Sequence, residues 1–273
     1  MATITTERIP GNPAIAVDRA GSGELLVFLH GIGGNRTNWT EQIEHFAEHF
    51  HALAWDARGY GLSDDYDGPL DFADFSRDLA RLIDHYGVER AHLVGLSMGG
   101  RIAQDFYARY PDRVSTLVLV ATFTGFKHFS EAERRQFVEL RRRPLLEGKE
   151  PKDIAPVVAR TLAGPRATEA QFARLVASMA ALHKVSYLKT IESTTMYDAE
   201  PDLEALAVPT LLVFGADDGL TRADLGRQMA SRIRGAELVV VEHAGHLVNI
   251  EAPEAFDDAV LPFLLKHRRR VPS

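Results

Sequence analysis

The sequence predicts an α/β protein: a doubly wound, mostly parallel sheet with helices on both faces. Short apolar runs alternate with segments of helical periodicity, a pattern typical of parallel sheets. The runs are apolar throughout, as expected for strands that are buried on both faces. A middle segment without any strand pattern predicts a helical cap inserted between two strands of the sheet.

The alternating pattern in the first half of the chain predicts, in order, strand 25–29, helix 41–50, strand 51–55, helix 71–86, strand 91–96, helix 98–109 and strand 114–121. The strands are expected wherever the sequence is almost continuously apolar. Helix 71–86 is expected because its apolar residues recur with a period near 3.6 up to a stop at Gly87. Pro111 is expected to close helix 98–109.

The cap is expected at 126–197, and the core at 1–125 and 198–273. Within the cap, charged and amphipathic patterns predict helices over 131–143, 153–162 and 168–188. The last of these carries an apolar stripe of Phe172, Leu175, Met179 and Leu182. The core then resumes with strand 210–214, helix 223–233, strand 237–241 and helix 254–267.

Composition narrows the classes of function. The 273 residues are 45% hydrophobic and 25% charged, and a net charge of 31 − 38 = −7 disfavours nucleic acid as a partner. The absence of cysteine excludes disulfides, thiolate nucleophiles and zinc–thiolate sites. No secretory signal and no apolar run near the roughly 20 residues of a membrane span are visible. We therefore expect a cytoplasmic protein without a membrane partner.

The most specific motif is Gly95-Leu96-Ser97-Met98-Gly99-Gly100, which matches G-x-S-x-G between an expected strand and an expected helix. A serine on such a sharp turn exposes its hydroxyl, and the small flanking residues make room for the turn. The motif therefore predicts that Ser97 is a nucleophile. When Ser97 attacks a carbonyl, the carbonyl oxygen becomes an oxyanion. The backbone N–H of Met98, the residue after Ser97, is expected to be one of its hydrogen-bond donors.

A serine nucleophile needs a base and an acid that orients the base. The acidic pair Asp217-Asp218 follows strand 210–214, and His243 and His246 follow strand 237–241. In doubly wound sheets the chemistry gathers at the carboxyl ends of the strands, where all of these side chains are expected. The residue order thus predicts a Ser–acid–His triad. It leaves open whether the acid is Asp217 or Asp218 and whether the base is His243 or His246.

The chain resembles the α/β-hydrolase family, and the likeness covers nearly all of it outside the cap. It rests on His30-Gly31, on the 56–63 segment DARGYGLS, on the turn around Ser97, and on the segments that contain the acid and the histidine. Within the family it looks closest to 3-oxoadipate enol-lactonases and related esterases. Carbon–carbon hydrolases of the meta-cleavage type and cofactor-free perhydrolases are similar neighbours.

The resemblance implies particular residues for each role. It implies Asp218 as the acid, with Asp217 as the competitor, and His246 as the base. It also implies that the second oxyanion donor is the N–H of Ile32. Arg222 stands where the family often has a proline, which is a departure from its pattern.

We expect a serine hydrolase that cleaves a small-molecule carboxylic ester or lactone through an acyl-enzyme. A carbon–carbon hydrolase, a perhydrolase and a ligand-binding protein without catalysis are the alternatives. Trp39 and Met179 are candidate substrate-binding residues; the alternative is core packing for Trp39 and cap packing for Met179. No cofactor or metal is expected, because the H-x-x-E-H match at 45–49 lacks a third ligand. The oligomeric state is left open.

Overall fold

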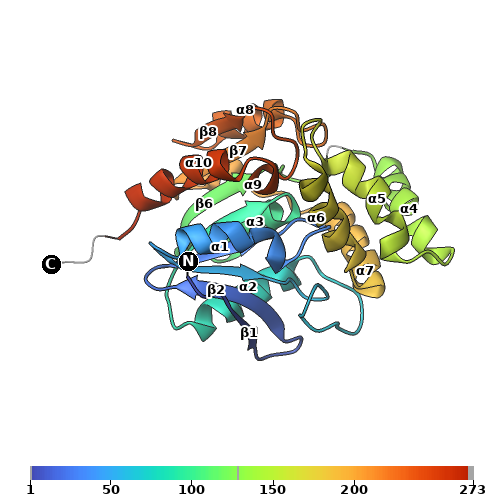
Figure 1. Cartoon of the computed structure of the whole chain (residues 1–273), viewed down its shortest axis with the longest axis horizontal. Helices are drawn as coiled ribbons and strands as arrows, with labels where there is room; N and C mark the ends of the chain where they lie inside the picture. The colour runs from blue at the N-terminus through green and yellow to red at the C-terminus, as the bar shows by residue number, and fades with distance from the viewer. Residues whose placement is uncertain (1, 128, 270–273) are drawn as a thin grey trace.

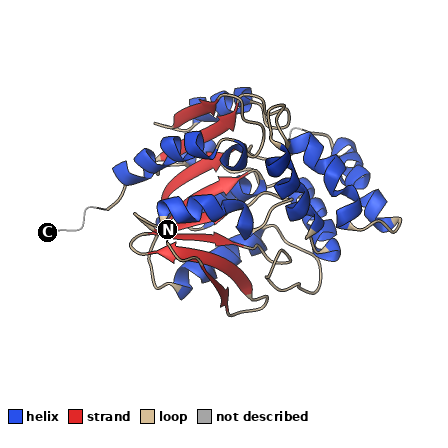
Figure 2. Ribbon diagram, viewed as in Figure 1, coloured by secondary structure: helices blue, strands red, loops and turns tan. Residues whose placement is uncertain are grey.

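The computed structural model describes residues 2–127 and 129–269. Its centre is an eight-stranded sheet with the order β1-β2-β4-β3-β5-β6-β7-β8 (Figures 1 and 2). The strands are β1 Thr5–Ile9, β2 Ile15–Gly21, β3 Leu25–Leu29, β4 His51–Trp55, β5 Ala91–Leu96, β6 Val114–Val120, β7 Thr210–Gly215 and β8 Glu237–Val241. All pairs from β4 to β8 are parallel, whereas β1 and β2 pair antiparallel. The doubly wound, mostly parallel sheet is thus confirmed.

Helices cover both faces of the sheet. One face packs against α1 (Thr40–Phe46) and α10 (Pro253–Lys266), and the other against α2 (Ala73–His85), α3 (Met98–Arg109) and α8 (Ala223–Arg232). The short helices η1 (Arg36–Trp39), η2 (Pro111–Arg113), η3 (Leu203–Ala205) and α9 (Val248–Glu251) lie in the connections. Every residue of β3 and β5 is buried, as their apolar sequences predict.

Four further helices lie between β6 and β7 and gather at one end of the sheet, on the right in Figure 1. They are α4 (Glu131–Leu146), α5 (Pro151–Leu162), α6 (Glu169–Ala180) and α7 (Lys184–Met196). They stand where the sequence predicts a helical insertion, and we call them the cap. The division of the chain at 126–197 stays a prediction.

Two N-terminal strands and one helix break were not predicted. Strand β2 carries Asp18 and Arg19 in its middle, and Asp18 is buried because Arg36 and Thr6 hydrogen-bond to it. The expected helix 168–188 is instead two helices, α6 and α7, that meet near His183. No glycine or proline marks this break. His183 instead contacts Asp65 and the carbonyl of Gly61 in the core.

Candidate active site

Ser97 stands alone between β5 and α3 in a backbone conformation that few residues adopt. Its φ of 54° and ψ of −113° lie outside the ordinary regions for a side-chain-bearing residue, at a cost of about 1–3 kcal/mol. The glycines around it leave no room for a β-carbon. One on Gly95 would lie 2.3 Å from the Gly99 carbonyl oxygen, and one on Gly99 would lie 2.1 Å from the Leu29 carbonyl oxygen. The turn therefore depends on G-x-S-x-G as a packing motif.

The same close packing brings the end of β3 beside Ser97. The loop after β3 is held by His30, whose Nε2 accepts the Ala57 N–H at 3.1 Å. Its Nδ1 then carries the proton and donates to the Gly31 carbonyl at 2.8 Å. Burial lowers the pKa of His30, which favours this neutral form. The Tyr60 hydroxyl donates to the Ile32 carbonyl at 3.0 Å, so the loop is fixed on both sides of Gly31.

The backbone N–H groups of Ile32 and Met98 are available to an oxyanion. Met98 is the first residue of α3, so its N–H has no partner within the helix. In the part of the chain that the structure describes, no hydrogen bond uses the Ile32 N–H. Ile32 and Met98 also line one cavity together with Ser97. The geometry is compatible with two donors facing a substrate carbonyl.

Asp218 and His246 are hydrogen-bonded to each other at the ends of β7 and β8. His246 Nδ1 donates to Asp218 Oδ2 at 2.9 Å, and both side chains are buried. This bond leaves His246 Nε2 as the free proton acceptor of the ring. Thr221, which the sequence analysis missed, donates its hydroxyl to the same carboxylate oxygen at 2.6 Å. Its position three residues after Asp218 could have predicted this bond, because Thr side chains often hydrogen-bond to groups three residues away.

The environment of Asp218 favours its ionised form. Burial alone would raise the pKa of this carboxyl, but the hydrogen bonds and the nearby charge of His246, together with Thr221, lower it below the usual value. The neighbouring alternatives lie elsewhere: Asp217 and His243 are both exposed. The structure therefore brings together Asp218 and His246 rather than Asp217 and His243.

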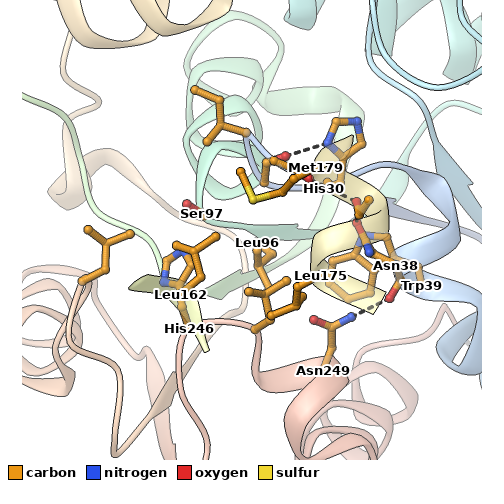
Figure 3. A pocket seen from close by; sticks show the side chains of 17 residues that line it. His30, Asn38, Trp39, Leu96, Ser97, Leu162, Leu175, Met179, His246 and Asn249 are labelled. Atoms are coloured by element: carbon orange, nitrogen blue, oxygen red, sulfur yellow. Dashed lines mark hydrogen bonds between the residues drawn. The ribbon is translucent and has the colours of Figure 1, made fainter. Parts of the chain in front are cut away.

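Ser97 and His246 line the same small pocket of about 60 Å³, shown in Figure 3 with Leu162 and Met179 around it. No hydrogen bond joins Ser97 to His246 among the described residues. Ser97 also lines a larger cavity of about 620 Å³ between the core and the cap. The hydroxyl of Ser97 thus stands where the two spaces meet.

The two candidate substrate-binding residues differ in their surroundings. Met179 lines both spaces. A β-carbon on Gly33 would lie 3.1 Å from the Met179 methyl group; Gly33 lies in the loop 30–34 after β3, which we call the oxyanion loop after its expected donor Ile32. Trp39 borders the small pocket, yet its side chain is buried and stacks on Phe28 with ring centroids 5.0 Å apart. Met179 therefore lies where a substrate contact is expected, and Trp39 packs in the core.

Glu251 joins the cap to the loop that carries His246, and the sequence analysis did not single it out. Its carboxylate accepts the N–H of Gly164 in the cap at 2.9 Å and the N–H of Gly245 at 3.0 Å. The N–H of His246 itself donates to the carbonyl of Leu162, at the end of α5, at 3.2 Å. Burial raises the pKa of Glu251, although these N–H bonds oppose the shift. The cap and the His246 loop are therefore held by shared bonds.

Metal-binding clusters and membrane-spanning helices are two features that residues 2–127 and 129–269 lack. No group of three or more His, Cys, Asp or Glu side chains there could hold a metal ion. None of the helices there is both long and apolar enough to cross a bilayer.

The profile of the alpha/beta hydrolase fold family matches residues 24–253. The chain belongs to this family. It is 28% identical to 3-oxoadipate enol-lactonase 2 of Acinetobacter baylyi, over 86% of each protein. It is 30% identical to the 2-hydroxy-6-oxononadienedioate/2-hydroxy-6-oxononatrienedioate hydrolase of Klebsiella pneumoniae, over 92% of this chain and 91% of that one.

Solved structures give the same picture of this α/β-hydrolase. A thermophilic esterase from Thermogutta terrifontis superposes with a TM-score of 0.84 at 29% identity, covering 98% of this chain and 100% of that one. The enol-lactonase from Burkholderia xenovorans superposes with a TM-score of 0.85 at 25% identity, covering 96% and 100%. The relatives are hydrolases of differing substrates, so the family supports hydrolysis and leaves the bond that is cleaved to be proposed.

Proposed function

We propose that the protein is a serine hydrolase that cleaves a carboxylic ester or lactone through an acyl-enzyme. The observation that carries the proposal is the hydrogen bond of 2.9 Å between Asp218 and His246, because His246 lines the same pocket as Ser97 on its strained turn. The similarity to enol-lactonases and to an esterase supports the choice of ester or lactone.

The proposed reaction assigns the proton transfers to His246, its orientation to Asp218 and the attack to Ser97. His246 Nε2 removes the proton of the Ser97 hydroxyl, and Asp218 holds the ring through Nδ1 and stabilises the imidazolium that forms. The Ser97 oxygen attacks the carbonyl carbon, and the N–H groups of Ile32 and Met98 bind the oxyanion. His246 then gives its proton to the leaving alkoxide. Water, deprotonated by His246, then attacks the acyl-enzyme, and the His246 imidazolium returns this proton to the Ser97 oxygen as the acid is released.

The test is turnover of p-nitrophenyl acetate by wild type and by Ser97→Ala. We expect Ser97→Ala to lose about a million-fold in kcat, as when the nucleophile of a triad is removed. A fluorophosphonate probe should label wild type at Ser97 and fail to label the variant. Equal turnover by both proteins would refute the proposal, and an unlabelled wild type would favour a ligand-binding role.

A carbon–carbon hydrolase is the second candidate, because a relative 30% identical over most of the chain is named as a dienedioate hydrolase. The same three residues would then cleave a vinylogous 1,5-diketone. An ester panel run beside a 2-hydroxy-6-oxodienoate separates the two. Faster turnover of the dienoate, with equal dependence on Ser97, would replace the ester proposal.

A further inference from the structure

The cavity between the core and the cap is lined by cations, although the protein as a whole is acidic. Its walls include four arginines and a single carboxylate, that of Glu133, among the described residues. The net charge of the chain is −7. The arginines come from three helices, α3, α4 and α8: Arg101, Arg134, Arg141 and Arg232. A positively charged cavity attracts anions, even though the protein as a whole is negatively charged.

Two of these arginines have no carboxylate partner. Arg134 pairs with Asp198, and Arg232 lies 3.8 Å from Glu204. Arg101 and Arg141 have no carboxylate within 4.0 Å in the described ranges, 2–127 and 129–269. Buried cations are normally paired, so this pair of guanidinium groups is unusual at a cavity wall.

Arg101 is the more deeply buried of the two. It is 5% exposed, and it donates to the Thr194 carbonyl at the end of α7 at 2.6 Å, while its Nε has no partner among the described residues. Burial lowers the pKa of Arg101 to about 10, although the nearby Glu200, Tyr197 and Asp105 raise it in part. Arg101 is therefore still a cation at neutral pH. A guanidinium has five N–H donors, and among the described residues the Thr194 carbonyl is the one acceptor that the Arg101 guanidinium reaches.

The position of Arg101 ties it to the candidate nucleophile. Arg101 stands one helical turn after Ser97, and its backbone N–H donates to the Ser97 carbonyl at 3.2 Å. Residues four apart on a helix lie on the same face. Both line the cavity, as does Arg141 of α4. An anion on these arginines would therefore occupy the same space as a group bonded to Ser97.

Aromatic rings complete this wall. Phe123, Phe126 and Phe137 line the cavity, and the Phe126 centroid lies 5.0 Å from that of Phe123 and 5.2 Å from that of Phe137. The Arg101 guanidinium carbon lies 5.5 Å from the centroids of Phe123 and of Phe126. The Arg141 guanidinium stacks on Phe137. The wall thus offers ring faces and N–H donors side by side, which suits a flat apolar group that carries an anion.

We propose that Arg101 and Arg141, with the surrounding phenylalanines, bind an aromatic carboxylate on the substrate. The inference rests on the proposed function for the reaction at Ser97 and adds the chemical class of the substrate. The bond that breaks is the ester or lactone at Ser97. The carboxylate on the ring takes no part in the chemistry and orients the substrate in the cavity.

The first test compares matched acetyl esters. We expect kcat/KM for 4-acetoxybenzoate to exceed that for its neutral isostere 4-acetoxybenzamide by about tenfold or more, because one charge-assisted contact is worth that much. We also expect 4-hydroxybenzoate to inhibit turnover more strongly than 4-hydroxycyclohexanecarboxylate, which has the anion without the aromatic ring and, like 4-hydroxybenzoate, no ester to cleave. A wild-type enzyme that shows no preference for the carboxylate ester over the amide overturns the anion site, and equal inhibition by the two carboxylates overturns the aromatic part.

Arg141→Gln and Arg143→Gln form a matched pair on α4. Arg143 pairs with Glu139, is exposed and does not line the cavity. We expect Arg141→Gln to remove most of the preference for the carboxylate over the amide. Arg143→Gln should keep the preference. An equal loss in both variants would mean that a general field attracts the anion, and the proposed site would be wrong.

Binding to the Ser97→Ala protein tests the site without any turnover. Calorimetry with 4-hydroxybenzoate, the product of the test ester, should show binding that weakens about tenfold in Ser97→Ala/Arg141→Gln. Arg101→Gln in the same background should weaken it as well, and Arg101→Lys should restore part of the affinity. No binding to Ser97→Ala overturns the inference. If Ser97→Ala binds 4-hydroxybenzoate but the wild-type protein hydrolyses none of the esters, the proposed function is refuted and the anion site is not.

Discussion

The carboxyl edge of the sheet and the cap differ in the burial and in the polarity of their side chains. All six residues of β7, which leads to Asp218, are buried. In contrast, α4 of the cap buries only Val138 and Leu145 of its 16 residues, and the face that it turns to the cavity carries arginines. Close packing holds the side chains of the first region in place, so that even the loss of one methyl group would be felt there. The second is shaped by charged and aromatic side chains that enclose a large space.

The difference separates two roles in one active site. The sheet edge holds the groups that we propose for bond cleavage, and there His246 and Thr221 both donate to Asp218. The cap supplies about half of the residues that line the larger cavity, where a substrate would bind. Changes in the edge should therefore alter kcat, and changes in the cap should alter the choice of substrate and KM.

The largest expected effect lies at the sheet edge. We expect Asp218→Asn to lower kcat about 10,000-fold with little change in KM, because the amide can no longer hold the ring in the tautomer that leaves Nε2 free. The measurement is steady-state turnover of p-nitrophenyl acetate. Asp217→Asn, an exposed neighbour, is the control and should stay near wild type. Equal losses in both would break the assignment of the acid.

The same variant has a signature in stability. The pKa of Asp218 is lowered in the folded protein, so its ionised form stabilises the fold above the unfolded pKa of about 3.9. That contribution is complete above about pH 5 and declines as the pH falls through the folded pKa. Urea unfolding should therefore show a gap between wild type and Asp218→Asn at pH 7 that narrows by pH 3. A gap that widens in acid would contradict this reading of Asp218.

The next effect lies where the two regions join. We expect Glu251→Gln to lower kcat about tenfold, with a smaller change in KM, because it weakens the charge-assisted bonds that hold the His246 loop. The pKa of Glu251 is raised by burial, so the advantage of wild type over the variant should shrink as the pH falls below that raised value. Exposed Glu254 provides the control variant Glu254→Gln. A change confined to KM would place Glu251 with the cap alone.

A smaller effect is expected from the cap side. Met179→Ala should raise KM for p-nitrophenyl acetate about threefold to tenfold and leave kcat within about twofold, because a buried thioether side chain that lines both spaces is lost. Met179→Leu, which keeps the volume, is the control. A drop in kcat with constant KM would mean that Met179 holds the oxyanion loop rather than the substrate.

The smallest effect on catalysis is expected at Trp39. Trp39→Phe should leave KM unchanged and lower the free energy of unfolding by about 1–3 kcal/mol, since the indole is fully buried against Phe28 and Phe256. Urea denaturation beside steady-state kinetics measures both. A shift in KM as large as that of Met179→Ala would return Trp39 to the substrate pocket.

Much of the fold could be read from local patterns. The parallel strands and the helices around them follow from apolar runs and 3.6-residue periodicity, which are short-range properties. Strands β1 and β2 could not be read in this way. The buried Asp18 of β2 is tolerated because Arg36, far along the chain, pairs with it. The break between α6 and α7 likewise depends on contacts of His183 with distant core residues.

The sequence by itself determined the turn at Ser97 and the order of the acidic and basic residues, because both depend on residue type at fixed spacing. It left open which acid contacts which histidine. Only tertiary structure decided that, since burial and the Thr221 and His246 bonds select Asp218 over an adjacent identical side chain. It also decided the wall of the cavity, where residues from helices far apart in the chain meet around one unfilled space.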